Sequence, residues 1–257
     1  MQWLIQNSGM TFDALDHNTE PLIKALDELG VEKHAIGYVP IEQKIVGLDG
    51  LDSSKPTIFY GSTKVAQLGA NTIFKPGSFY EAIWFDPSYA AANRSDMLNT
   101  DIRAITTLEL RNNWLSEPMF IKSVDPKILT GMILETDEKS MFLDEYSHVP
   151  DDAVLTLSPL HTITHEWRFF VVGGAVAAGS QYKHDGIKRI REAVPEDVWA
   201  IARQFAAGWL PSRNVVMDIC RLTDGSYRIV EFNAINSSGF YNCNVSNIVT
   251  AINNLFA

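Results

Sequence analysis

Residues 215–233 contain the pattern that most constrains the fold, two apolar segments joined by a tight turn. Residues 215–220 are apolar, residues 227–232 are rich in β-branched and aromatic side chains, and Asp224-Gly225 lies between them. An Asp-Gly pair between two such segments is a strong signal for a β-hairpin. We therefore predict two antiparallel strands that are apolar, and hence buried, on both faces.

The turn also predicts which side chains of this hairpin lie opposite each other. If Asp224 and Gly225 are its two central residues, Asp218 lies directly opposite Glu231. Asn233 follows on the same face because side chains alternate along a strand. Two opposed carboxylates repel each other, so acids at this position need a reason. A three-residue turn would shift the register by one and move one acid to the other face.

A bound hard cation is one such reason. Mg²⁺ takes oxygen ligands, usually from one or two protein carboxylates, and completes its shell with water and phosphate oxygens. We therefore predict that Asp218, Glu231 and Asn233 are metal ligands. The alternative is a pair of acids at a solvated end of the sheet, without a metal.

These three residues resemble the metal-binding signature of the ATP-grasp superfamily, in which an Asp on one strand precedes Glu-x-Asn on the next. Residues 237–241 resemble the segment that follows Glu-x-Asn in a divergent clade of that superfamily. The clade includes the eukaryotic cell-division-cycle and translation-initiation assembly factor and many phage and bacterial relatives. The resemblance extends from residue 117 to the C-terminus, and more loosely over the N-terminal third.

The resemblance implies an α+β fold of the ATP-grasp type, in which two α+β lobes clamp ATP and Mg²⁺. We expect a small N-terminal α/β lobe at residues 1–95, where a β-α-β pattern begins the chain. The ATP-grasp region would follow at residues 96–257. Within it we expect a phosphate-loop lobe over residues 96–157 and a metal-binding lobe over residues 158–257.

The resemblance also implies which residues of the first lobe bind ATP. Lys122 ends a predicted strand, and a strand-borne base contacts the phosphates in the family. Lys127 lies in the loop that follows, which closes over them. Ser158 and Leu160 occupy the linker between the lobes, where backbone groups bind adenine. The chain lacks the glycine-rich loop of better-known ligases, so phosphate binding would depend on the lysines.

A second hairpin is predicted around a Gly-Gly turn at residues 173–174. Its Glu-x-Arg sequence resembles that of the clade, which places Glu166 near the ribose and Arg168 near the phosphates or the acyl group. Arg168 would lie opposite Gly179, whose missing side chain would leave space for a ligand. Lys183 is a further candidate for phosphate binding. The alternative is a structural ion pair of Glu166 or Arg168 on this face.

Other elements follow from apolar spacing and capping signals. Apolar side chains recur through residues 95–112 at mixed three- and four-residue spacing, which predicts a helix. A final helix is predicted after Ser246 as its cap. Lys188, Arg189 and Arg191 are expected to be solvated, with a substrate-facing role left open.

Composition excludes several functional classes. The 257 residues carry a net charge of −10 without a block of Lys or Arg, which argues against nucleic-acid binding. Two cysteines are too few for a disulfide framework. The first ten residues lack signal-peptide features, and no segment is apolar enough to span a membrane. We therefore expect a cytoplasmic protein without membrane or nucleic-acid partners.

The function that the resemblance implies is ATP- and Mg²⁺-dependent ligation of a carboxylate to an amine or thiol through an acyl phosphate. Lys122, Lys127 and Arg168 would orient the γ-phosphate while Mg²⁺ neutralises the developing charge. The substrates, whether small molecules, peptides or proteins, are not specified. Three alternatives stay open: an ATP-binding assembly factor without ligation, a small-molecule kinase, and a noncatalytic α/β protein.

Overall fold

The computed structural model of the chain describes residues 1–7, 9–12, 18–69, 74–77, 79, 81–124, 128–191 and 193–257. The chain divides into two compact units. Unit 1 comprises Met1–Glu81, Glu166–Asp218 and Asn233–Ala257, and unit 2 comprises Ala82–His165 and Ile219–Phe232. None of the described helices is both long and apolar enough to cross a bilayer. The predicted lobe boundaries near residues 95 and 157 stay a prediction.

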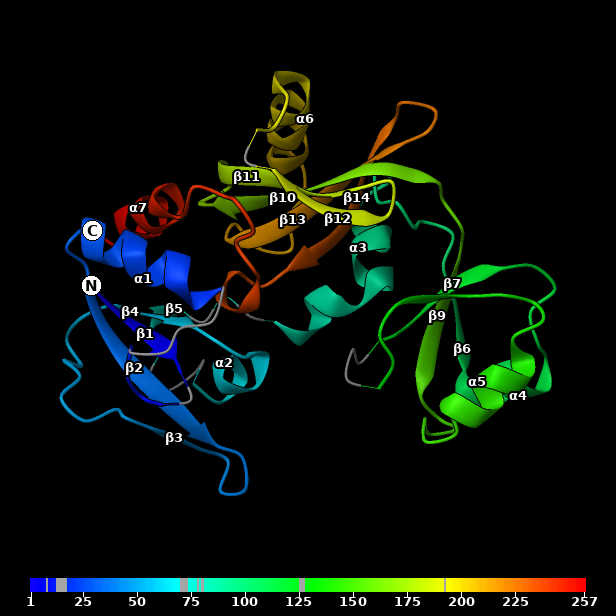
Figure 1. Ribbon diagram of the computed structural model, residues 1–257, viewed down its shortest axis with the longest axis horizontal. Coiled ribbons are helices and arrows are strands. Elements are labelled where there is room, and N and C mark those ends of the chain that lie inside the picture. The colour runs from blue at the N-terminus through cyan, green and yellow to red at the C-terminus, as the bar shows by residue number, and fades with distance from the viewer. Residues whose placement is uncertain are drawn as a thin grey trace. The chain divides into compact units, whose positions relative to one another are not determined.

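The N-terminal sheet of unit 1 has the strand order β3-β2-β1-β4-β5 (Figure 1). Its strands are β1 (Gln2–Gln6), β2 (Glu32–Val39), β3 (Lys44–Val46), β4 (Thr57–Tyr60) and β5 (Pro76–Gly77). All pairings are parallel except that of β2 with β3. Helices α1 (Thr19–Glu28) and α2 (Thr63–Gly69) supply the crossovers. The predicted β-α-β start of the chain is therefore observed.

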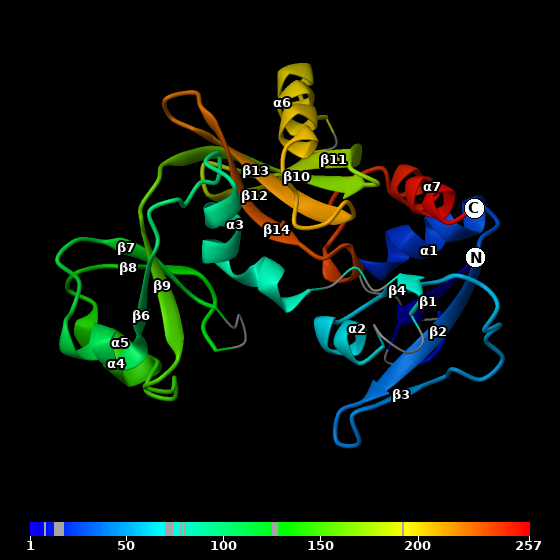
Figure 2. The same cartoon turned by 180° about the vertical axis from the view of Figure 1, so that it is seen from behind.

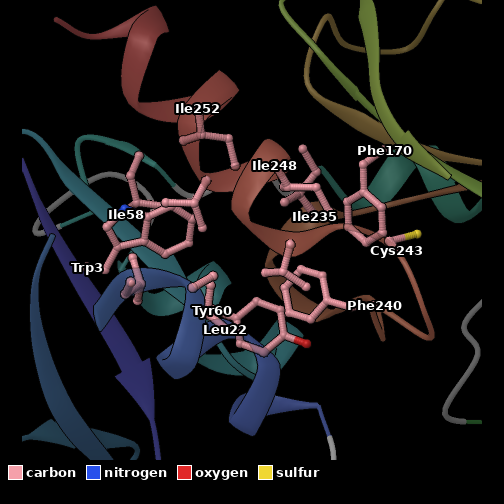
Figure 3. Close-up of a cluster of buried hydrophobic side chains, with 14 of the residues drawn as sticks. Trp3, Leu22, Ile58, Tyr60, Phe170, Ile235, Phe240, Cys243, Ile248 and Ile252 are labelled. Atoms are coloured by element: carbon pink, nitrogen blue, oxygen red, sulfur yellow. The ribbon is translucent and has the colours of Figure 1, made fainter. Parts of the chain in front are cut away.

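Helices α1 and α7 (Val245–Leu255) lie side by side and bury their apolar faces in one core (Figures 1 and 2). Figure 3 shows this core, to which both ends of the chain contribute: Trp3, Leu22, Ile58, Tyr60, Phe170, Ile235, Phe240, Cys243, Ile248 and Ile252. Burying one large apolar side chain stabilises a fold by about 1.5–3 kcal/mol. The predicted cap of α7 is wrong, because the Asn244 side chain, not that of Ser246, accepts from the N–H of Asn247.

A second five-stranded sheet has the order β12-β11-β10-β13-β14. Its strands are β10 (Ile163–Val172), β11 (Ala175–His184), β12 (Ile187–Arg191), β13 (Val215–Leu222) and β14 (Tyr227–Asn233). Helix α6 (Glu196–Ala207) connects β12 to β13. Gly173 and Gly174 both have positive φ angles, 63° and 85°, as a two-residue type I′ turn requires. The predicted hairpin of β10 and β11 is therefore confirmed.

The turn between β13 and β14 differs from the predicted one. The N–H of Gly225 donates to the carbonyl of Leu222, and the N–H of Leu222 donates to the carbonyl of Ser226. With Gly225 at a φ of 85°, this is a three-residue turn with a glycine bulge. At the turn the register is therefore shifted by one residue from the expected one. The prediction that Asp218 directly opposes Glu231 depended on the shorter turn and loses its basis.

Unit 2 contains a four-stranded antiparallel sheet of order β6-β9-β7-β8. Its strands are β6 (Arg103–Thr106), β7 (Met119–Ser123), β8 (Met132–Leu134) and β9 (Val154–Pro159). Helices α4 (Thr107–Asn112) and α5 (Lys139–Glu145) pack beside it, with Leu110, Ile121, Phe142 and Leu155 in the core. The 3₁₀ turns η1 (Ala82–Phe85) and η2 (Ile235–Ser237) and helix α3 (Pro87–Asn93) complete the described elements.

The helix predicted over residues 95–112 is wrong in its first half. Residues 103–106 form β6, which pairs with β9, and helix α4 begins only at Thr107. Thr106 and Glu109 form a capping box at this start, since each side chain binds the backbone N–H of the other. Sheet pairing satisfies the backbone before the cap, so the apolar spacing serves a strand there.

Candidate functional site

Arg168 and Asp218 form a buried ion pair on two neighbouring strands of unit 1, β10 and β13. Arg168 Nε donates to Asp218 Oδ1 at 2.8 Å, and Nη2 donates to Oδ2 at 2.7 Å. Arg168 Nη1 also donates to the carbonyl of Gly239 at 3.3 Å. The two side chains are only 11% and 2% exposed. This bidentate geometry is the strongest form of an arginine–carboxylate pair and fixes both groups in orientation.

Both members of this pair are ionised. Burial alone would lower the pKa of Arg168, but the charge and hydrogen bonds of Asp218 outweigh it and raise that pKa. A carboxylate offers about four acceptor positions, and Arg168 occupies two of those on Asp218. The predicted metal ligand is thus held in place by an arginine that takes only about half of its acceptor positions.

Glu166 pairs with Lys183 rather than with Arg168. Lys183 Nζ lies 3.1 Å from Glu166 Oε1, and the hydroxyl of Tyr182 donates to Oε2 at 2.5 Å. The Glu166 side chain is only 8% exposed, whereas that of Lys183 is 43% exposed. The structure therefore brings four predicted site residues together in unit 1, as two adjacent ion pairs.

Two tyrosines that the sequence analysis did not single out cover these ion pairs. The rings of Tyr182 and Tyr241 stack with centroids 5.0 Å apart and an interplanar angle of 6°. The guanidinium of Arg168 lies 5.0 Å from the ring of Tyr241 and 5.7 Å from that of Tyr182. Tyr241 adopts a φ of 50°, an uncommon conformation for a bulky residue and one that clusters at functional sites. The only signal for it was its place in the segment 237–241.

The space expected beside Gly179 is filled. A Cβ atom placed on Gly179 would lie 2.4 Å from the ring of Phe169. Phe169 itself is completely buried and packs edge-on against Trp199 of α6. The prediction that this glycine leaves room for a ligand is therefore wrong, and Gly179 serves close packing of an aromatic ring.

Unit 2 contains a second pair of predicted site residues. Lys122 Nζ on β7 lies 3.1 Å from Glu231 Oε2 on β14. Both side chains are partly accessible, at 17% and 38% exposure. The backbone of Lys122 is fixed by Thr156, whose hydroxyl donates to the carbonyl of Lys122 at 3.0 Å. A predicted phosphate-binding lysine is thus adjacent to a predicted metal ligand.

The remaining predicted residues are more scattered. Ser158 is buried on β9 opposite Phe120, and Leu160, directly after that strand, is 41% exposed. Asn233 is half-buried at the end of β14. Lys127 lies outside the residues that the structure describes. The roles given to these residues in adenine, metal and phosphate binding stay predictions.

The metal set is of a mixed kind. Within the described parts of the chain, no three His, Cys, Asp or Glu side chains converge as a metal site. The predicted set has only two such residues, Asp218 and Glu231, and its third ligand would be the amide oxygen of Asn233. Carboxylate and amide oxygens are donors that Mg²⁺ accepts.

Sequence comparison assigns the family. The model of an ATP-grasp domain, family 3 of its clade within the superfamily, matches residues 52–252. The chain belongs to this ATP-grasp family. The matched range contains all of the described candidate residues, from Lys122 to Asn233. No curated protein matches the chain.

Several solved ATP-grasp structures resemble this ATP-grasp protein over nearly their whole length. A RimK-domain ATP-grasp protein from Sphaerobacter thermophilus DSM 20745 is 15% identical, with a TM-score of 0.62 over 98% of this chain and 99% of that one. D-alanine–D-alanine ligase from Bacillus anthracis, solved with ATP, is 13% identical, with a TM-score of 0.62 over 99% and 98%. The ligase PsnB, solved with a precursor variant, Mg and ADP, is 15% identical, with a TM-score of 0.57 over 99% and 97%. These likenesses establish the ATP-grasp fold.

Proposed function

We propose that this chain is an ATP- and Mg²⁺-dependent ligase that activates a carboxylate as an acyl phosphate and transfers the acyl group to an amine or thiol. The observation that carries the proposal is the family match over residues 52–252. The likeness to D-alanine–D-alanine ligase with ATP and to PsnB with Mg and ADP supports it. Because PsnB was solved with a peptide precursor, a peptide is the first substrate to test.

Asp218, Glu231 and Asn233 would hold the Mg²⁺ ion in this proposal. The donor set fits, since it offers two carboxylates and an amide oxygen, and neither carboxylate has all its acceptor positions taken by its cation. A Mg²⁺ ion bound there would neutralise charge on the phosphate oxygens during transfer.

The basic residues have separate roles. Lys122 would leave Glu231 to the metal and bind a phosphate oxygen as a point charge. Arg168 acts in part as a positioning residue, because its fork holds Asp218 in the orientation in which the carboxylate meets the metal. Glu166 would accept a hydrogen bond from the ribose, with Lys183 keeping its carboxylate ionised.

Binding of ATP with and without Mg²⁺ tests the proposal first. Calorimetry should give clear ATP binding with Mg²⁺ and weak binding with EDTA, and Lys122→Ala should weaken binding while leaving the unfolding temperature unchanged. The exposed Lys44→Ala on β3 is the matched control, with no expected effect. Equal affinity with Mg²⁺ and EDTA would contradict the metal assignment.

Product analysis then distinguishes ligation from the other reactions of a nucleotide site. A ligase should release ADP and phosphate only when both a carboxylate substrate, such as an acidic peptide, and an amine or thiol are present. A stable phosphorylated product would identify a kinase. ATP binding that only strengthens association with a protein partner would identify an assembly factor.

A further inference from the structure

The hairpin of β11 and β12 brings two lysines into direct opposition. Its turn residues, Asp185 and Gly186, have φ angles of 48° and 72°, and Lys183 on β11 pairs in register with Lys188 on β12. Like charges directly opposite each other destabilise a strand pair. The net charge of the chain is −10, so an excess of lysines does not account for this pairing. The Asp-Gly turn was the sequence signal for it.

The lysine pair lies beside the tyrosine stack of the candidate site. Lys183 Nζ is 5.6 Å from the ring of Tyr182, and Lys188 Nζ is 5.9 Å from the ring of Tyr241. Arg168 contacts both rings, so three cations surround one aromatic pair. Burial raises the pKa of Tyr241, so its phenol is neutral near pH 7 and supplies no negative charge to them.

Carboxylates neutralise only two of these three cations. Asp218 binds Arg168, and Glu166 binds Lys183. Lys188 has no carboxylate within ion-pair distance among the residues that the structure describes, and the whole of β12 is exposed. One accessible cation with no protein counterion in the described chain is thus held next to the two ion pairs of the candidate site.

We infer that Lys188, together with Lys183, binds an anionic group of a ligand, a phosphate or a carboxylate. An anion between the two ammonium groups would remove their repulsion and neutralise the third cation. The inference deepens the proposed function and rests on it for the source of the anion. That source is either a phosphate of the nucleotide or a carboxylate of the acyl substrate.

Charge-neutral variants test this inference on the full chain. Calorimetry at low salt would measure binding of three probes, ATP with Mg²⁺, inorganic phosphate and succinate. Lys188→Gln should weaken at least one of them by about tenfold or more, as expected for loss of a charged hydrogen bond. Arg189→Gln, on the next residue of the same exposed strand, changes the net charge equally and should leave all three unchanged. Lys188→Arg should restore binding.

The probe that responds identifies the source of the anion. Weaker ATP binding in Lys188→Gln indicates a nucleotide phosphate, whereas weaker succinate or phosphate binding with ATP unchanged indicates a substrate anion. Unchanged affinities for all three, or equal losses in Arg189→Gln, would overturn the inference even if ATP binds normally. A wild-type protein that binds phosphate or succinate through Lys188 but not ATP would instead overturn the proposed function alone.

Discussion

Two ion pairs of the candidate site differ mainly in burial, and this difference decides what each residue contributes. Asp218 and Arg168 are almost completely buried, so their attraction acts in a medium of low dielectric constant. Glu231 and Lys122 are partly solvated, and water screens their attraction. Asp218 is therefore essential to the fold as well as a predicted ligand, whereas Glu231 can exchange its lysine for a metal at lower cost.

Replacing Asp218 by Asn should destabilise the protein by about 3–5 kcal/mol, because Arg168 would be left buried and without its counterion. Glu231→Gln is the matched change in the exposed pair and should cost no more than about 1 kcal/mol. Urea denaturation of the two variants without nucleotide measures both. Similar losses in the two variants would contradict this assignment of burial.

The thiol of Cys243 should make stability fall at high pH. Burial raises the pKa of Cys243 to about 12 from an ordinary value of 9.0, and the thiol donates to Ser180 Oγ at 3.4 Å. The unfolded chain loses this proton near pH 9 and the folded chain does not. The contribution of this group is therefore full below pH 9 and declines as the pH rises toward 12.

Denaturation at about pH 8 and about pH 10.5 tests this, with Cys243→Ala as the comparison. The wild type should lose more stability between the two pH values than the variant does, since all other titrating groups are shared. Equal losses in both would show that Cys243 ionises in the folded state.

At the scale of elements, what could be predicted followed from local signals. Gly173-Gly174 predicted its hairpin, and Glu-x-Arg and Glu-x-Asn indicated residues that the structure pairs with other charged groups. The length of the turn around Gly225 was not specified, because Asp-Gly suits both a two-residue turn and the bulged turn that forms. The stack of Tyr182 on Tyr241 joins segments far apart in sequence, so no local pattern predicted it.

Gly225 should be the sensitive position of the β13–β14 turn, because its φ of 85° suits glycine. Gly225→Ala should cost about 1 kcal/mol, and Gly225→Val more, since a β-branched residue avoids this conformation. Gly225→Asn should cost least, because Asn tolerates positive φ. Thermal unfolding of the three variants gives this order, and a Val variant as stable as the Asn variant would contradict the bulged turn.

At the scale of the whole molecule, unit 1 joins the two ends of the chain. Trp3 Nε1 on β1 donates to Asn253 Oδ1 on α7 at 3.2 Å, and α7 buries its apolar face against the N-terminal core. The N-terminal segment thus completes its core with residues from the last helix. A β-α-β segment that looks self-contained in sequence depends on distant residues for its burial.

Ile252→Ala should therefore weaken the N-terminal sheet as well as α7. Loss of this fully buried side chain should cost about 2–5 kcal/mol. Leu255→Ala, at a position that is 40% exposed on the same helix, should cost less than about 1 kcal/mol. Hydrogen exchange should show faster amide exchange in β1 for Ile252→Ala alone. Unchanged protection of β1 would mean that the sheet is stable without α7.

The contact of Trp3 with Asn253 also sets the order of events during synthesis. The two residues are 250 positions apart, which at about 5–20 residues per second is about 12–50 seconds of translation. Throughout that time the apolar face of α1 and the side chain of Trp3 emerge from the ribosome without the helix that covers them. The nascent chain therefore offers a binding surface to chaperones until its final residues are made, and slow translation of the C-terminal segment should lower the soluble yield.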